Sequence, residues 1–125
     1  MAKKILIIDD EELIVQTLAR VLEKNRYDVL IAKTGNDAIV MAEEEDFDLI
    51  ISDVRMPGMN GVETCRSVLE VIKAKKRKDV PLIFITGYAD EAIETKAKAL
   101  SPRAYIYKPF DYAEFLTNVH AALKG

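Results

Sequence analysis

Several residue types that would constrain a fold or a chemistry are scarce in this sequence. Cys65 is the single cysteine, so no intrachain disulfide can form, and we expect a reducing, cytoplasmic compartment. His120 is the single histidine, and without a cluster of cysteines or histidines around it a zinc site is disfavoured. The apolar run after Lys3 and Lys4 is too short for a signal peptide, and no transmembrane segment is present. We therefore expect no membrane insertion.

The small net charge and the absence of glycine-rich loops and linkers each narrow what this chain can do. A formal net charge of -3 gives no general attraction to nucleic acid, so direct nucleic-acid binding is not expected. No Gly-x-Gly-x-x-Gly or Walker-type loop occurs, which argues against dinucleotide or ATP binding. No stretch is rich in proline, glycine or serine. The 125 residues are therefore expected to form a single domain over residues 1–125.

Short apolar runs alternate five times with longer segments of helical period, a pattern typical of a parallel sheet with crossover helices. The predicted strands are Lys4–Ile8, Asp28–Ala32, Leu49–Ser52, Leu82–Thr86 and Ala104–Lys108. Apolar stripes define the helices between them, and we place Leu13 on the buried stripe of the first and Tyr112 on that of the last. The fourth helix has mainly small residues on its stripe, so it should bury the least area and be the most mobile.

Two further residues and one charged run have simple structural interpretations. Cys65 is in register with the apolar stripe of the third helix, which favours a small core side chain over a reactive thiol. His120 is expected on a helix surface. Asp111 is the expected N-cap of the last helix. The basic run over residues 73–78 falls where the third helix should end, a position at which cations stabilise the helix dipole.

Polar residues follow four of the apolar runs directly. Asp9 and Asp10 follow the first, Asp53 follows the third, Thr86 the fourth and Lys108 the fifth. The carboxyl ends of parallel strands share one edge of the sheet, which is where ligands bind in open α/β folds. Four strand exits are unlikely to place compatible groups at one edge by accident, although Asp9 or Thr86 taken singly would suit a turn or a helix cap. The pattern predicts a functional site.

The chemistry of these groups points to a divalent cation and a phosphoryl group. Three carboxylates repel one another unless a hard cation such as Mg²⁺ offsets their charge. A carboxylate is ionised at neutral pH and can attack phosphorus without a general base, and Asp53 is our candidate nucleophile. Lys108 could stabilise charge on the phosphoryl oxygens, and the Thr86 hydroxyl could donate a hydrogen bond to one of them.

Together these residues form motifs that are typical of one protein family. The chain resembles the receiver domains of response regulators in two-component signalling, a family that includes the stand-alone chemotaxis regulator. The resemblance covers essentially the whole chain and is carried by four motifs: Ile7–Asp10, Ile51–Gly61, Thr86–Gly87 and Tyr105–Phe110. It implies a flavodoxin-like α/β fold, with a five-stranded parallel sheet of order 2-1-3-4-5 and five helices on both faces.

The resemblance also implies a role for each site residue. Asp53 would accept a phosphoryl group from the phosphohistidine of a histidine kinase or a phosphotransfer protein. Asp10, Asp53 and the backbone carbonyl of Arg55 would hold Mg²⁺ or Mn²⁺, with Asp9 assisting through water. Lys108 would pair with the acceptor and then with the phosphoryl group, and the Lys108-Pro109 bond would be cis.

The same resemblance implies a switch rather than an enzyme, because the family catalyses only its own phosphoryl transfer and slow self-dephosphorylation. Thr86 and Tyr105 match the switch pair, in which the threonine turns toward the phosphoryl group and the aromatic ring rotates inward. The face formed by the fourth helix, fifth strand and fifth helix would then bind a downstream protein, with the chain a monomer or a phosphorylation-dependent dimer. The sequence carries no DNA-binding or enzymatic output domain, so it either docks to another protein or is a receiver cut from a longer chain.

Some positions depart from the family's common pattern, and two other classes of function stay open. Ser101-Pro102 stands where Gly-Ala is common, and the proline should stop the fourth helix sharply. We hypothesise that the bulky Arg55 and Tyr88 crowd the attacking water and lengthen the phosphoryl lifetime. A phosphohydrolase would need a second acid-base carboxylate close after Asp53, which the sequence does not offer. A module of the same fold that is never phosphorylated is the other alternative.

Overall fold

The computed structural model describes residues 2–54, 60–87 and 90–124 and shows five strands alternating with five helices among them. The strands are β1 (Lys4–Ile8), β2 (Asp28–Ala32), β3 (Leu49–Asp53), β4 (Leu82–Thr86) and β5 (Ala104–Tyr107). The helices are α1 (Glu12–Lys24), α2 (Gly35–Glu44), α3 (Gly61–Ala74), α4 (Glu91–Lys98) and α5 (Tyr112–Lys124). The strand bounds agree with the sequence prediction to within one residue, because a short run of β-branched and aromatic residues is a local signal.

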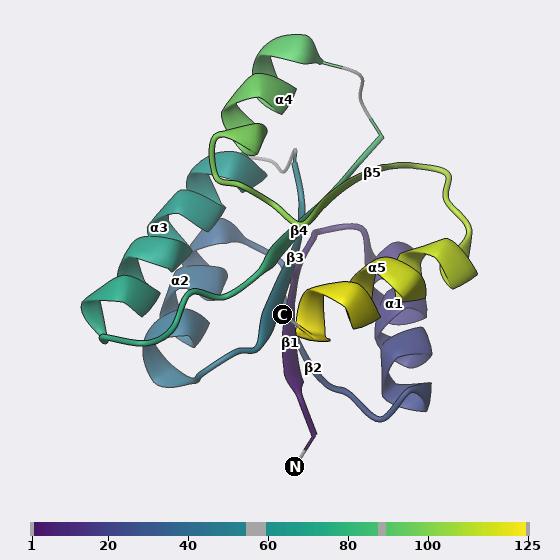
Figure 1. The fold of residues 1–125 in the computed structure, drawn as a ribbon, viewed down its shortest axis with the longest axis horizontal. Helices are drawn as coiled ribbons and strands as arrows, with labels where there is room; N and C mark the ends of the chain where they lie inside the picture. The colour runs from purple at the N-terminus through teal and green to yellow at the C-terminus, as the bar shows by residue number, and fades with distance from the viewer. Residues whose placement is uncertain (1, 55–59, 88–89, 125) are drawn as a thin grey trace.

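The strands form one parallel sheet in the order β2-β1-β3-β4-β5, which confirms the predicted flavodoxin-like arrangement. Figure 1 views this sheet nearly edge-on, with α1 and α5 on one face and α2, α3 and α4 on the other. The register is set by neighbouring runs, as where Leu6 of β1 lies between Leu30 of β2 and Ile50 of β3. The three strands β1, β3 and β4 consequently have both faces covered, and nearly all of their residues are buried.

Two separate hydrophobic clusters fill the space on the two faces of the sheet. Ile5 and Ile7 of β1 pack with α1 and α5, whereas Leu6 and Ile8 of the same strand pack with α2, α3 and α4. This division follows from the strand's two-residue period, which sends successive side chains to opposite faces. Cys65 lies fully buried in the second cluster, and burial raises the pKa of its thiol to about 12. The structure thus agrees with the core interpretation of this cysteine.

Two side chains assigned to buried stripes lie on the surface instead. Leu13 is 81% exposed, because the packed face of α1 is formed by Val15, Leu18, Ala19 and Leu22, and a residue two positions before Val15 points the other way. Tyr112 is 45% exposed in the first turn of α5, where its ring meets only the edge of Phe110 among the ring contacts of the described residues. The sequence pattern overestimated the burial of both residues.

Helix α4 is attached to the domain more lightly than its neighbours. Ala97 is its single buried residue among those described, whereas α3 buries six of its residues. Asp90 caps the helix by accepting a hydrogen bond from the backbone N–H of Ile93 at 3.1 Å. The small apolar stripe seen in the sequence therefore does correspond to a small buried area. No helix in the described part of the chain is long and apolar enough to cross a membrane.

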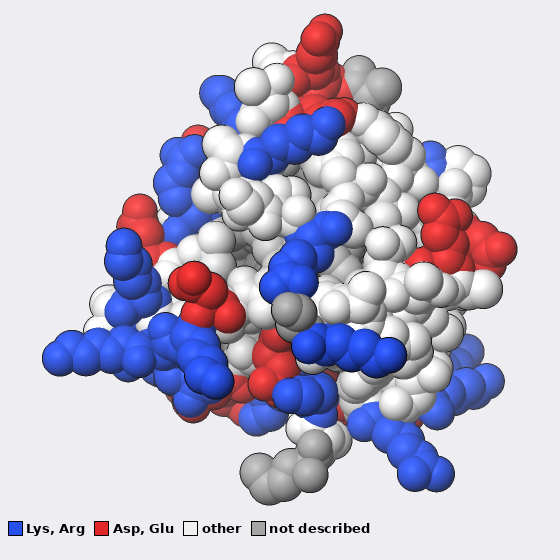
Figure 2. All heavy atoms as spheres, viewed as in Figure 1, with Lys and Arg blue, Asp and Glu red and all other residues white. Residues whose placement is uncertain are grey.

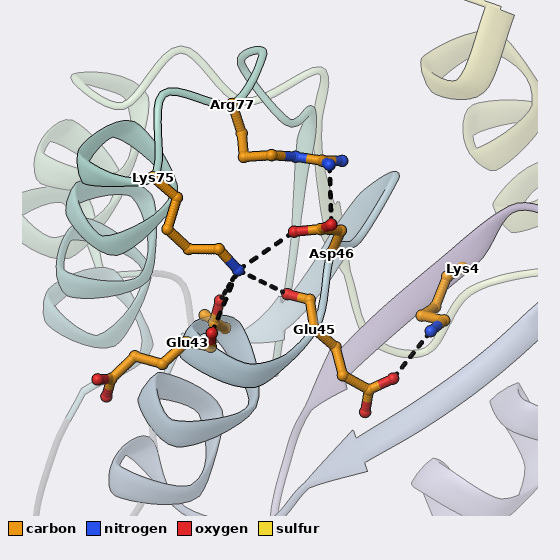
Figure 3. A network of polar contacts seen from close by, with 7 residues as sticks. Lys4, Glu43, Glu45, Asp46, Lys75 and Arg77 are labelled. Carbon is orange, nitrogen blue, oxygen red and sulfur yellow. Dashed lines mark hydrogen bonds and ion pairs between the residues drawn. The ribbon is translucent and has the colours of Figure 1, made fainter.

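The basic run at the end of α3 serves a neighbouring helix as well as its own. Lys75 donates from its ammonium to the carbonyl oxygens of Ala42, Glu43 and Glu45, which are at the C-terminal end of α2 (Figure 3). Asp46 joins Lys75 and Arg77 with N···O distances of 3.1 and 2.8 Å. These cations neutralise the carbonyl end of α2, so the helix-dipole argument holds but applies across two helices.

The remaining cations of this run face solvent. In Figure 2 basic side chains gather at the lower left, over the end of the molecule where α3 finishes in Figure 1. The carboxyl edge of the sheet lies at the other end of the strands, so this basic region is remote from the predicted site.

Candidate functional site

The residues that follow the strands in sequence are brought together at the carboxyl edge of the sheet. Asp9 directly follows β1, Asp53 and Thr86 are the last residues of β3 and β4, and Lys108 directly follows β5. Asp9 and Asp53 are 2% and 6% exposed and Thr86 is fully buried, while Asp10 lies exposed beside them. Their shared position follows from the parallel topology, because every strand ends at the same edge.

Asp9, Asp10 and Asp53 each bring a carboxylate oxygen to within 4.8 Å of the others. Carboxylate oxygens are the ligands that hard divalent cations prefer, and Mg²⁺ commonly binds through one or two of them together with water. The exposed Asp10 leaves solvent access for such water molecules. The chemistry and spacing of the three groups therefore fit Mg²⁺ or Mn²⁺. The carbonyl of Arg55, which the family resemblance adds to this set, lies outside the described residues, as does Tyr88.

The pKa of the Asp9 carboxyl group is raised by its surroundings. Burial raises its pKa from 3.8 to about 6, and the nearby charge of Asp53 adds to the rise. The backbone N–H of Glu11 opposes this by donating to Oδ1 of Asp9 at 3.0 Å, and the charge of Lys108 opposes it as well. The net result is a buried carboxylate whose ionisation is disfavoured in the absence of a cation.

Lys108 reaches into the carboxylate cluster and contacts three acidic side chains. Its Nζ atom lies 3.5 Å from Oδ2 of Asp53, 3.7 Å from Oδ2 of Asp9 and 2.9 Å from Oε1 of Glu11. Burial lowers the pKa of the ammonium, but the hydrogen bond that it donates to Glu11 and the charges of the two aspartates outweigh this effect and raise it. The lysine is therefore held protonated beside Asp53.

The contact with Glu11 was not predicted from the sequence. The signal available was the acidic run over residues 9–12, which continues past the two aspartates into the start of α1. Nothing local in that run indicates which of its members reaches across to a residue 97 positions later in the chain.

Asp53 is fixed in position by its own strand and by the start of α3. The backbone N–H of Val54 donates to its Oδ1 at 2.7 Å, and the hydroxyl of Ser52 donates to its backbone oxygen at 2.8 Å. Gly61 packs so closely against that backbone oxygen that a β-carbon at this position would lie 1.7 Å from it. One carboxylate oxygen is thus tied to the backbone, while the other faces Lys108.

Thr86 and the tyrosines of β5 share one face of the sheet. Phe84 is in register with Tyr105, and Thr86 with Tyr107, so the two-residue period directs all four toward the same side. Tyr105 is half-buried, with its ring centroid 6.1 Å from that of Phe84 and 5.4 Å from that of Tyr107. The aromatic side chains form a continuous path from the strand interior to the surface beside α4.

The end of β5 and the turn that follows it complete this side of the site. The backbone N–H of Lys108 donates to the carbonyl oxygen of Thr86 at 2.7 Å, and the Lys108-Pro109 peptide bond is cis. Asp111 caps α5 by accepting from the N–H of Ala113 at 2.8 Å.

Two hollows lie on the surface beside β5. One, of about 310 Å³, is lined by Glu91, Glu94, Thr95, Lys98 and Tyr107, and lies between α4 and β5. The other, of about 490 Å³, follows β5 to the first turns of α5, and its lining includes Tyr105, Tyr107, Phe110 and Asn118. Tyr107 borders both hollows and donates a hydrogen bond to Glu94 of α4.

His120 is more engaged than a simple surface position implies. It is half-buried on α5, where its Nδ1 lies 2.5 Å from the hydroxyl oxygen of Tyr27 and its ring is 5.7 Å from that of the tyrosine. It is remote in the sequence from the carboxylate cluster and is not among its described contacts.

Comparisons with known proteins agree with this geometry. The sequence model of the response regulator receiver domain matches residues 5–120. A CheY-like response regulator receiver domain protein from Methanospirillum hungatei is 29% identical to this chain, with a TM-score of 0.88. The match covers 99% of this chain and 95% of the Methanospirillum chain. The chemotaxis protein CheY4 of Vibrio cholerae is also 29% identical, with a TM-score of 0.86, and the match covers 98% of this chain and 100% of the CheY4 chain.

A further similar structure contains a phosphorylated residue and a metal ion. A response regulator protein from Burkholderia pseudomallei, described with a phosphorylated aspartic acid, a calcium ion and citrate, is 30% identical with a TM-score of 0.81. The match covers 97% of this chain and 66% of that one.

Proposed function

Because this chain belongs to the response regulator receiver domain family, we propose that it is a phosphorylation-controlled switch whose phosphoryl acceptor is Asp53. The donor in this proposal is the phosphohistidine of a histidine kinase or of a phosphotransfer protein. The observation that carries the proposal is the convergence of a buried acceptor carboxylate, two further carboxylates and a lysine ammonium at one sheet edge. The domain would occupy residues 1–125 and act in the cytoplasm.

Asp53 is the carboxylate best placed to attack phosphorus. Its Oδ1 is engaged by the N–H of Val54, and its Oδ2 is directed toward the ammonium of Lys108 at 3.5 Å. Lys108 would stabilise negative charge as it develops on the phosphoryl oxygens, and the buried Thr86 hydroxyl would donate to one of them after transfer. No general base is needed because a carboxylate nucleophile carries no proton that has to be removed before it attacks.

Asp9, Asp10 and Asp53 are the residues that would hold Mg²⁺ or Mn²⁺, with Asp9 acting through water and the Arg55 carbonyl as a further ligand. A bound divalent cation would supply charge neutralisation for the incoming phosphoryl oxygens. The Burkholderia relative supports this proposal, since its structure is described with both a phosphorylated aspartic acid and a calcium ion.

The output of the switch would be the surface formed by α4, β5 and α5. A phosphoryl group adds roughly two negative charges, and its new contacts would shift the population between inactive and active states. Thr86 and Tyr105 are the proposed switch pair, and they share one face of the sheet with the exposed Tyr107. The light attachment of α4 and the hollows beside β5 make this surface suitable for a downstream protein, with the domain a monomer or a phosphorylation-dependent dimer.

Phosphorylation by a small donor tests this proposal directly. The purified protein is incubated with acetyl phosphate and Mg²⁺, and its intact mass is measured. We expect a gain of one phosphoryl group in the wild type, no gain in Asp53→Asn, and an undiminished gain in Asp28→Asn, which removes an exposed carboxylate at the far end of β2. No gain in the wild type would favour an unphosphorylated interaction module, and rapid turnover of unrelated phosphoesters would favour a hydrolase.

A further inference from the structure

We propose that Glu11 is a positioning residue that competes with the phosphoryl group for the ammonium of Lys108. This inference rests on the proposed function and assigns a residue that neither the family resemblance nor the sequence motifs include. Among the described contacts of the Lys108 Nζ atom, the shortest, at 2.9 Å, is to Oε1 of Glu11, while the acceptor Asp53 is at 3.5 Å. The lysine is therefore held more closely by Glu11 than by the residue it is proposed to serve.

The side chain of Glu11 is not used to cap the helix that it begins. Glu11 is the N-cap residue of α1, with extended backbone angles, yet its side chain makes no capping hydrogen bond. Serine, threonine, aspartate and asparagine are the residues that cap helices well, because their short side chains reach back to the free N–H groups. The longer glutamate is instead directed across the site to Lys108. Its contact is thus explained by the site and not by the local structure.

The backbone of Glu11 fixes where this side chain starts. Its N–H donates to Oδ1 of Asp9 at 3.0 Å, and its carbonyl oxygen accepts from the N–H of Val15 at 3.0 Å. The glutamate is consequently anchored at both backbone polar groups, one to the carboxylate cluster and one to α1. Only its side chain is left to move when Lys108 moves.

The charges at the site determine which contact Lys108 makes in each state. Lys108 is 15% exposed, whereas the side chain of Glu11 is 53% exposed and retains its hydration on leaving the lysine. When a phosphoryl group is attached to Asp53, the ammonium is drawn toward the new oxygens, and the contact with Glu11 is lengthened or lost. Glu11 therefore stabilises the unphosphorylated arrangement and weakens the hold of Lys108 on the phosphoryl group.

Beryllofluoride, which binds the carboxylate oxygen of an aspartate as a phosphoryl mimic, is a suitable equilibrium probe. Its affinity for the wild type, Glu11→Gln and Glu11→Asp is measured by calorimetry, at a Mg²⁺ concentration that saturates each protein as established by titration of the metal alone. Glutamine removes the charge and keeps the length, whereas aspartate keeps the charge and is one methylene too short for the contact. We expect both variants to bind beryllofluoride roughly two- to five-fold more tightly, the size expected of an ion pair with one exposed partner.

The aspartate variant separates a specific contact from a general effect of negative charge. If Glu11 acts only through the electrostatic field, Glu11→Asp binds like the wild type, and the inference is overturned. The matched control is Glu12→Gln, which removes the neighbouring carboxylate, an exposed group paired with Lys33 at 2.9 Å, and is expected to leave the affinity unchanged. A far-ultraviolet circular dichroism melt of each variant verifies that it is folded.

The remaining outcomes also decide the question. Weaker binding by Glu11→Gln would mean that Glu11 orients Lys108 for the phosphoryl group instead of competing for it, and would overturn the inference while leaving the proposed function intact. Unchanged binding in both variants would do the same. Failure of the wild type to bind beryllofluoride in the presence of Mg²⁺ would overturn the proposed function as well.

Discussion

The buried carboxylate of Asp9 should make the metal-free protein less stable than it would be with a neutral side chain there. The substitution Asp9→Asn keeps the shape of the side chain and an oxygen that can accept from the N–H of Glu11, but it removes the charge. Burial and the charge of Asp53 raise the pKa of Asp9 from 3.8 to about 6, so the folded protein binds this proton more tightly than the unfolded chain does. The ionised form is therefore disfavoured by folding.

The size of the effect follows from that difference. A pKa difference of one corresponds to about 1.4 kcal/mol, so a rise from 3.8 to about 6 corresponds to a penalty on the order of 3 kcal/mol when Asp9 is ionised. That net rise already includes the attraction of Lys108, and part of it is repulsion that Asp9 shares with Asp53. We therefore expect Asp9→Asn to increase the free energy of unfolding by about 1–3 kcal/mol at pH 8.

The stability difference between Asp9→Asn and the wild type should depend on pH. The penalty is fully present above the folded pKa of about 6, decreases as the pH falls through that value, and is absent below 3.8, where the carboxyl group is protonated in both states. Urea unfolding, followed by circular dichroism in a chelating buffer at pH 8, 6.5 and 5, measures the difference between variant and wild type. The difference should be nearly the same at pH 8 and 6.5 and clearly smaller at pH 5.

Two results would refute this reasoning. A less stable Asp9→Asn at pH 8 would mean that the ion pair with Lys108, at 3.7 Å, outweighs the cost of burial. A gain that is constant from pH 8 to 5 would mean that the charge is not its source. The control Asp28→Asn, at an exposed position, is expected to leave the stability unchanged within about 0.5 kcal/mol.

Three further substitutions test packing, capping and helix attachment in this fold. Gly61→Ala should lower the free energy of unfolding in urea by at least about 1–3 kcal/mol, because the added β-carbon would collide with the backbone of β3. Gly87→Ala is the control, since its β-carbon would lie 4.0 Å from the nearest neighbouring atom, and it should show no steric cost. Lys75→Met should lower the free energy of unfolding by about 1 kcal/mol, because carbonyl oxygens of α2 lose their donor. The control Lys73→Met should lower it by less than half of that, and equal losses in the two variants would count against the capping role of Lys75. Tyr107→Phe should remove the hydrogen bond to α4 and speed amide hydrogen exchange in that helix several-fold, and unchanged exchange would show that the bond does not restrain it.

Much of the fold could be predicted because its signals are local. Each central strand is a run of apolar residues, as in Leu82–Thr86, and a run of this kind needs no knowledge of its partners to be recognised. The polar residue at the end of each run could be placed at the sheet edge from topology alone. The burial of Leu13 and Tyr112 was predicted wrongly, because an apolar residue in a first turn has the right period but can lie away from the packed face.

Much of the candidate site was foreseeable by the same argument, and the rest was not. The grouping of Asp9, Asp10 and Asp53 within 4.8 Å is the expected consequence of two neighbouring strands ending together. The distances from Lys108 to its partners depend on how β5 and its following turn close over the site. No pattern in the sequence encodes that closure.

The sequence by itself determined the kind of element at each position and the identity of the polar groups at the sheet edge, and the family resemblance supplied the order of the strands. Tertiary structure alone decided that Glu11 meets Lys108, that Asp9 is buried deeply enough to resist ionisation, and that Lys75 serves α2 instead of only its own helix. The physical reason is the range of the interactions. Periodicity and capping act within a few residues of the chain, whereas ion pairing and burial depend on surfaces that only folding brings together.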